Sequence, residues 1–175
     1  LVCAVKYSYE WSYKARYTNK GGQLAVVKLL LAYGAKIECD NDPAAALHYA
    51  IRKTPSNEYM HVLLNSPQNI DVNRKFNGFS ALLEAVIELR ERKEGTREQI
   101  SALLSRGADV NTVDNRGNSL LHRTDIVDKW LVNELKVFDV DFNQKGEYGR
   151  TPLHRLIDTE YCDMRDKKFH KQPRL

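Results

Sequence analysis

An internal repeat runs through most of this 175-residue chain and limits what it can fold into. A short pattern of small and apolar residues, with a leucine at a fixed place, recurs. Its copies are "AALHYAI" at 45–51, "SALLEAV" at 80–86, "SLLHRTD" at 119–125, "TPLHRLI" at 151–157 and, more weakly, "LVCAV" at 1–5. The column leucines are Leu1, Leu47, Leu82, Leu121 and Leu153, at intervals of 46, 35, 39 and 32 residues. Such self-similarity is typical of a chain built from stacked units.

A second apolar stretch follows each of the first four copies in chain order, which are those at 1–5, 45–51, 80–86 and 119–125. In "REQISALLSRGADVN", Ile100, Leu103 and Leu104 have the spacing of an amphipathic helix, and Gly107 stands where a helix can end. Thr96 with Gln99 predicts a capping box at the start of that helix. Each unit therefore predicts a helix, a short connection, a second helix and an extended polar turn. One unit cannot bury its own apolar stripe, so the pattern predicts a solenoid of stacked units.

Three segments carry a resemblance to a known family. They are "LLSRGADVNTVDNRGNSLLH" at 103–122, "GGQLAVVKLLLAYGAKIE" at 21–38 and "GRTPLH" at 149–154, and they are similar to parts of the ankyrin-repeat consensus, whose period is about 33 residues. The resemblance covers nearly the whole chain. It implies an all-α ankyrin-repeat solenoid of stacked helix-turn-helix units with projecting β-hairpin-like turns. We expect a single domain, 1–175, that is a fragment of a longer protein, with repeats at approximately 1–42, 43–77, 78–116, 117–148 and 149–175.

Several positions depart from the family pattern. "NSPQNIDVN" at 65–73 stands where the family has Gly-Ala, and "KVFDVDFN" at 136–143 contains no glycine. "HRTD" at 122–125 replaces the usual alanine pair, and no apolar second-helix stripe follows residue 157. We therefore expect irregular repeats rather than a consensus array.

The segment "YSYEWSYKARYTNK" at 7–20 interleaves aromatic rings with cations. Such interleaving is one form of a platform for single-stranded nucleic acid. The segment also falls in the longest interval of the repeat, so a lengthened first helix and connector fits it as well. Three interpretations stay open: cover for the end of the stack or packing on an upstream repeat, a protein-contact surface, and nucleic-acid binding. The last is disfavoured because the sequence has no RNP, KH or OB pattern.

Three histidines, His48, His122 and His154, directly follow the leucine column. Recurrence at one repeat position favours a structural role over a catalytic one. The ankyrin resemblance implies that this histidine hydrogen-bonds the backbone of the inter-repeat turn. The sequence also lacks zinc-ligand spacing, a Walker motif, a dinucleotide-binding glycine pattern and a nucleophile elbow. We expect no catalysis, no metal site and no cofactor.

Charge, hydropathy and cysteine usage narrow the class of partners. The formal net charge of +4 leans toward acidic partners but is too small to indicate nucleic acid by itself. The longest apolar run, 29–33, is too short to span a bilayer. Cys3, Cys39 and Cys162 are odd in number and widely spaced, which favours reduced thiols and an intracellular location, cytoplasmic or nuclear. The sequence leaves the oligomeric state open.

The ankyrin resemblance also implies where a partner would bind. In that architecture partners usually lie along a concave face made by the turn tips and the exposed positions of the first helices. By motif position the tips are 40–42, 74–76 with Phe79, 113–116 and 145–150, and the helix positions are Tyr49, Glu84, Arg123 and Arg155. The candidate partner-binding residues are Tyr49, Arg74, Lys75, Phe76, Phe79, Val113, Asn115, Arg116, Arg123, Lys145, Tyr148, Arg150 and Arg155.

Two features of this set suggest its use. Phe76, Phe79 and Tyr148 are aromatic at positions expected to face solvent, and arginines lie beside them; both types are common hot-spot residues. The sequence thus predicts a protein–protein interaction module, a scaffold or adaptor, that binds a protein or peptide of acidic character. The alternatives are a regulatory or targeting segment of a larger enzyme, channel or effector and, third, nucleic-acid binding through the basic face. For any single lysine or arginine, a solubilising role is the favoured explanation, and it is the set of tip aromatics and arginines that favours binding.

Overall fold

The structure, a computed structural model, describes residues 20–37, 44–53, 57–89, 95–123 and 129–158. The chain divides into two compact units, Leu1–Asp109 and Val110–Leu175, here called the N-terminal and the C-terminal unit. Leu1, the tip 40–42, the three cysteines and residues 7–19 of the aromatic segment lie outside the described residues, so what was inferred for them stays a prediction. The single-domain organisation and the repeat boundaries also stay predictions.

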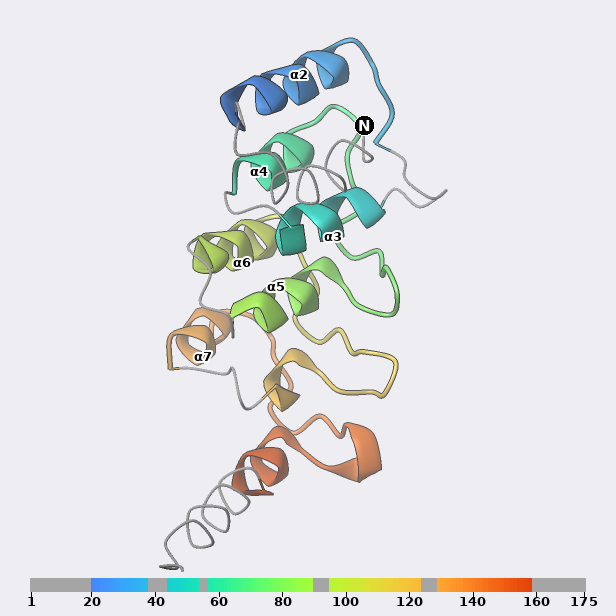
Figure 1. Cartoon of the computed structure of the whole chain (residues 1–175). Coiled ribbons are helices and arrows are strands. Elements are labelled where there is room, and N and C mark those ends of the chain that lie inside the picture. The colour runs from blue at the N-terminus through green and yellow to red at the C-terminus, as the bar shows by residue number, and fades with distance from the viewer. Residues whose placement is uncertain (1–19, 38–43, 54–56, 90–94, 124–128, 159–175) are drawn as a thin grey trace, which may run out of the picture. The chain divides into compact units, whose positions relative to one another are not determined.

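Paired helices build the N-terminal unit. Its described residues form α2 (Lys20–Ala32), α3 (Ala44–Lys53), α4 (Glu58–Leu64), α5 (Ala81–Leu89) and α6 (Thr96–Ser105), shown in Figure 1. Helix α3 packs against α4 and α5, α5 packs against α6, and α2 packs against α4. The column leucines Leu47 and Leu82 are buried between them, as are Leu103 and Leu104 of the predicted stripe. Each such side chain contributes about 1.5–3 kcal/mol of burial free energy, so the helix pairing stabilises the unit.

The two ends of α6 bear out one prediction and correct another. Gly107 follows the helix with φ 78°, a left-handed conformation that costs glycine little, and its N–H donates to Leu104 O at 3.0 Å. The predicted capping box is wrong. Helix α6 already includes Thr96, and the N-cap residue is Gly95, which makes no side-chain cap. Because Gly95 turns the chain at φ 84°, the helix begins one residue earlier than a threonine cap would set it.

A hydroxyl residue sets where the other first helices begin. Ser80, Ser119 and Thr151 stand at one repeat position, and helical structure starts at the residue after each. The Oγ of Ser80 accepts a hydrogen bond from the N–H of Leu83 at 3.2 Å, which is the bond of an N-cap. Ala45 occupies this position in the earlier repeat, and α3 begins before it, at Ala44.

The C-terminal unit is less regular. It contains the 3-10 turns η1 (Leu120–His122) and η2 (Glu147–Gly149), the helix α7 (Lys129–Leu135) and helical residues 152–158. Its core includes Leu120, Leu121, Leu131 and Leu135, all buried. In the described residues the first helix expected at the "HRTD" departure is only the single turn η1. Leu153, the last leucine of the column, is 64% exposed, whereas Leu47, Leu82 and Leu121 are buried.

The extended turns between helices are narrow and hairpin-like, as predicted. Phe76 pairs with Phe79 and Val113 with Ser119 as isolated antiparallel bridges. Backbone bonds close them: Phe76 N–H to Phe79 O at 2.9 Å, and Asp114 N–H to Asn118 O at 2.9 Å. In the C-terminal unit the next turn is closed by Gly146 N–H to Arg150 O at 2.8 Å.

Asparagine amides join successive turns within each unit. In the N-terminal unit the Nδ2 of Asn73 donates to Gly107 O at 3.0 Å, and its Oδ1 accepts from Asp109 N–H at 2.7 Å. In the C-terminal unit Asn111 makes the same two bonds, to Asp139 O at 2.7 Å and from Asp141 N–H at 2.9 Å. These amides fix the spacing of the turns that carry the candidate site residues.

Candidate functional site

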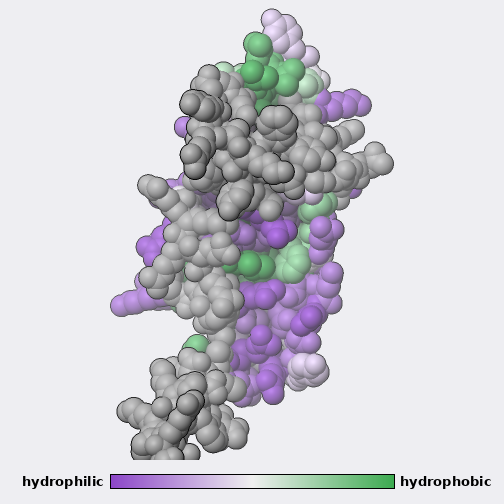
Figure 2. Space-filling model, viewed as in Figure 1, coloured by the Kyte–Doolittle hydropathy of each residue, from purple (hydrophilic) through white to green (hydrophobic). Residues whose placement is uncertain are grey.

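The structure leaves all the predicted site residues at least partly accessible. The exposed ones are Arg74, Lys75, Asn115, Arg116, Lys145, Tyr148 and Arg150. The half-buried ones are Tyr49, Phe76, Phe79, Val113, Arg123 and Arg155. Figure 2 shows hydrophilic side chains over much of the described surface in this view, with an apolar patch near α2, where Val26, Leu29, Leu30 and Tyr33 are exposed.

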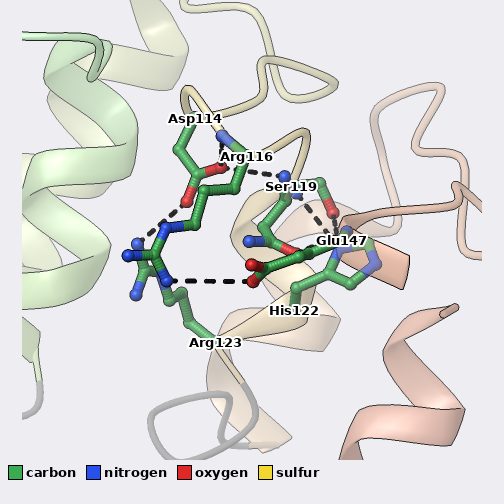
Figure 3. A network of polar contacts seen from close by, with 7 residues as sticks. Asp114, Arg116, Ser119, His122, Arg123 and Glu147 are labelled. Carbon is green, nitrogen blue, oxygen red and sulfur yellow. Dashed lines mark hydrogen bonds and ion pairs between the residues drawn. The ribbon is translucent and has the colours of Figure 1, made fainter. Parts of the chain in front are cut away.

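Asp114 organises the turn 113–119 of the C-terminal unit. Its side chain is only 6% exposed, and its Oδ1 accepts hydrogen bonds from the N–H groups of Arg116 at 2.8 Å and Asn118 at 2.9 Å. Its Oδ2 lies 3.1 Å from the guanidinium of Arg123, as Figure 3 shows. The carboxylate therefore holds the turn backbone and one candidate arginine together.

Asn118 and His122 connect this turn to the next one. The Oδ1 of Asn118 accepts from Glu147 N–H at 3.1 Å, and the Nε2 of His122 lies 2.9 Å from Arg150 O. On its other side, the Nδ1 of His122 lies 3.1 Å from Ser119 N and 2.9 Å from Ser119 Oγ. The bond to the Arg150 carbonyl is the structural role that the ankyrin resemblance implied for this histidine.

Gly146 is the point of closest approach in this network, and it gives a testable prediction. A Cβ built on Gly146 would lie 2.6 Å from Asn118 Oδ1 and 2.7 Å from His122 Nε2. Gly146→Ala is therefore expected to displace both side chains and to lower the free energy of unfolding by about 1–3 kcal/mol. Urea unfolding measures this loss. Gly149→Ala is unsuitable as a control because Gly149 has φ 68°, a left-handed conformation that alanine adopts only with strain. The control is Asn115→Ala at an exposed turn position, which is expected to change the free energy of unfolding by less than about 0.5 kcal/mol.

Three of the predicted basic residues form ion pairs inside the C-terminal unit. Arg116 lies 3.8 Å from Glu147, Arg123 lies 3.1 Å from Asp114, and Arg150 lies 2.6 Å from Asp158. The side chain of Arg116 is 73% exposed, so its long pair with Glu147 is weakened by solvent and leaves it accessible. The positive charge of this surface is thus partly balanced by acidic neighbours, which the sequence hypothesis did not include.

Phe76 and Tyr49 come together in the N-terminal unit. Phe76 was expected to face solvent, but its ring is half-buried, with its centroid 5.9 Å from that of Tyr49 and 5.5 Å from that of His48. An antiparallel bridge between Phe76 and Phe79 closes the turn that carries this ring. Tyr148, by contrast, is 85% exposed, as expected.

Glu84 was expected at an exposed position of its first helix but is buried, and sequence reasoning did not single out Arg52. The side chain of Glu84 on α5 is 9% exposed, and its Oε1 lies 3.0 Å from the Nε of Arg52 on α3. The available signal was a carboxylate inside the apolar run "ALLEAVIEL", which is costly to bury without a partner. Its pairing could not be read from sequence, since Arg52 lies on another helix.

In the described part of the chain, no group of three or more histidine, cysteine or acidic side chains is arranged to hold a metal ion. None of the described helices combines the length and the apolar character needed to cross a membrane.

Comparison with known proteins agrees with the helix pairs and turns. Residues 15–114 match the family model for ankyrin repeats (three copies). The ankyrin repeat protein nuc-2 of Neurospora crassa is 32% identical over 95 residues, which are 54% of this chain and 8% of that protein. The chain thus matches a small part of the length of this relative. The predicted fold class, an all-α ankyrin-repeat solenoid, is confirmed, and the chain belongs to the ankyrin repeat family.

Proposed function

We propose that the chain is a non-catalytic protein-binding module whose partner contacts the turn tips and the first helices. Ankyrin repeats are generally protein–protein interaction modules. The observation that carries the proposal for this chain is the hydrogen-bonded network beneath the tips. Asp114, Asn118 and His122 fix two successive turns, so Arg116, Lys145 and Tyr148 project from a backbone that is already ordered. Pre-ordered contact residues lower the entropy cost of association.

The partner proposed is a protein or peptide segment that carries acidic residues. Arg74, Lys75 and Lys145 are exposed on the tips, and most of the Arg116 side chain is exposed to solvent. Complementary charge would mainly raise the association rate, and added salt would weaken it. We place this scaffold or adaptor role inside the cell, in the cytoplasm or nucleus, from the reduced-thiol interpretation of the three cysteines.

Tyr148 supplies a prediction that links stability to binding. This exposed tyrosine has φ 60° and ψ 23°, a left-handed conformation that disfavours a bulky residue. Asn77 holds the matching place, before glycine, in the turn of the N-terminal unit, with φ 51°. Tyr148→Asn is therefore expected to raise the free energy of unfolding by up to about 1 kcal/mol, because asparagine tolerates this conformation.

The same variant is expected to bind the partner about tenfold more weakly, since it removes an exposed aromatic side chain. Urea unfolding measures the first effect, and titration calorimetry with a selected peptide measures the second. A variant that is destabilised and binds normally would show that Tyr148 serves the fold rather than the partner.

Selection from a random peptide library tests the surface itself. The baits are the wild-type chain, a tip variant with Arg74→Glu and Arg116→Glu, and a control with Arg97→Glu and Lys136→Glu, an equal charge change away from the tips. The proposal expects acidic peptides that bind the wild type and the control, with at least about tenfold weaker binding to the tip variant. Equal binding to all three baits would contradict it. Retention of the wild type on heparin, reversed by salt, would instead favour the nucleic-acid alternative.

A second function, a regulatory or targeting segment of a larger protein, is favoured by one observation. The matched relative is far longer than this chain, since the aligned stretch is 8% of its length. In that case the partner segment would lie in the same polypeptide. Cross-linking of the full-length protein distinguishes the two, because an intramolecular partner gives cross-links that do not depend on protein concentration.

A further inference from the structure

His48 lacks the partners that its counterpart has. It occupies the same repeat position as His122 and is only 2% exposed, yet neither of its ring nitrogens makes a hydrogen bond. At His122 the hydroxyl and N–H of Ser119 satisfy Nδ1. Ala45 stands in place of that serine, so the Nδ1 of His48 has no equivalent hydroxyl partner. Buried polar atoms without partners are uncommon and call for an explanation.

Glu84 faces this unpartnered histidine. Its Oε2 lies 3.8 Å from His48 Nδ1, which is too long for a hydrogen bond, while its Oε1 is paired with Arg52 at 3.0 Å. A carboxylate has about four acceptor positions, and that of Glu84, whose side chain is still 9% exposed, is only poorly hydrated. Arg52 therefore pairs with one oxygen of Glu84, and the other oxygen lies beside a histidine whose ring nitrogens make no hydrogen bond.

Aromatic rings lie next to this polar pair. The ring of Phe76 contacts His48 at 5.5 Å and Tyr49 at 5.9 Å between centroids. Both Phe76 and Tyr49 are half-buried, so part of each ring is still open to solvent. The faces of such rings attract cations within about 6 Å. A carboxylate oxygen and open aromatic rings together favour a positively charged side chain.

We propose that Glu84 and His48 receive a lysine or arginine side chain of the bound partner, with Tyr49 and Phe76 lining the site. The partner's N–H group donates to Glu84 Oε2, and its alkyl stem lies against the rings. An acidic side chain does not fit here because Glu84 would repel it. This inference rests on the proposed function and adds to it, since the partner then carries a basic residue besides its acidic ones.

The test uses the peptide selection with two further baits, Glu84→Gln and the matched control Glu98→Gln on the exposed face of α6. Gln keeps the size of Glu84 and removes its charge, and thermal unfolding confirms that each bait is folded. The inference expects wild-type binders that carry a lysine or arginine and bind Glu84→Gln at least about tenfold more weakly, with normal binding to Glu98→Gln. Replacing the basic residue of the peptide by alanine should weaken its binding to the wild-type chain but hardly change its binding to the Glu84→Gln variant. Such non-additive effects are expected when two residues contact each other directly.

The possible outcomes separate the two proposals. Binders that depend on the tip arginines and bind Glu84→Gln normally would overturn the site at Glu84 and leave the proposed function standing. Binders that lose affinity for Glu84→Gln but carry only asparagine or glutamine would overturn the basic-residue assignment. Peptides that bind no bait above background would count against both.

Discussion

Leu121→Ala is expected to lower the free energy of unfolding by about 2–5 kcal/mol, whereas Leu153→Ala is expected to change it by less than about 1 kcal/mol. Both leucines belong to the repeat column and to the C-terminal unit. Leu121 is 5% exposed and Leu153 is 64% exposed. Truncating Leu121 removes buried apolar atoms and leaves a cavity, while truncating Leu153 mostly removes surface that water already contacts.

Urea unfolding of the two variants beside the wild type measures the difference. Leu153 serves as the matched control, since it has the same residue type, repeat position and unit. Equal losses for the two variants would mean that Leu153 is buried in the folded protein, and the account of the last repeat would then be wrong.

His122→Ala is expected to destabilise the protein by about 1–3 kcal/mol more than His48→Ala. Both rings are buried at one repeat position, so both variants lose similar packing. His122 also bonds Ser119 and the Arg150 carbonyl, and its removal leaves these groups without their partner. His48 has no such bonds to lose.

The free energies of unfolding of the two variants, each relative to the wild type, test this difference. The control is Ser119→Ala, which removes one partner of His122 and is expected to fall between them. A larger loss for His48→Ala would show that His48 is satisfied by contacts within the folded chain, and it would remove the main support for the site at Glu84.

Much of the fold could be predicted from the sequence because helix periodicity is a local signal. The stripe of Ile100, Leu103 and Leu104 and the glycine after it gave both the existence of α6 and its end. The start of α6 was misplaced because the left-handed backbone of Gly95 took the N-cap position from Thr96. The exposure of Leu153 could not be read from a repeat position, since burial depends on which side chains cover it.

The candidate site was predicted less completely because its contacts join distant parts of the chain. Motif position placed Arg116, Arg123 and Arg150 at accessible places. It could not show that Arg116 lies near Glu147 or that Asp114 is a buried partner of Arg123. The histidine column gave the role of His122 but not the exception at His48, where Ala45 replaces the serine that bonds the Nδ1 of His122.

Affinity capture on the tip variant tests the central claim most directly, which is that the turn tips and first helices bind a partner protein. Three baits are exposed to cell lysate at low and moderate salt: the wild-type chain, the variant with Arg74→Glu and Arg116→Glu, and the control with Arg97→Glu and Lys136→Glu. Each captured protein is then purified, and its affinity for each bait is measured. The account predicts a partner that binds the wild type and the control alike and binds the tip variant at least about tenfold more weakly. A partner that binds all three baits with one affinity would contradict it.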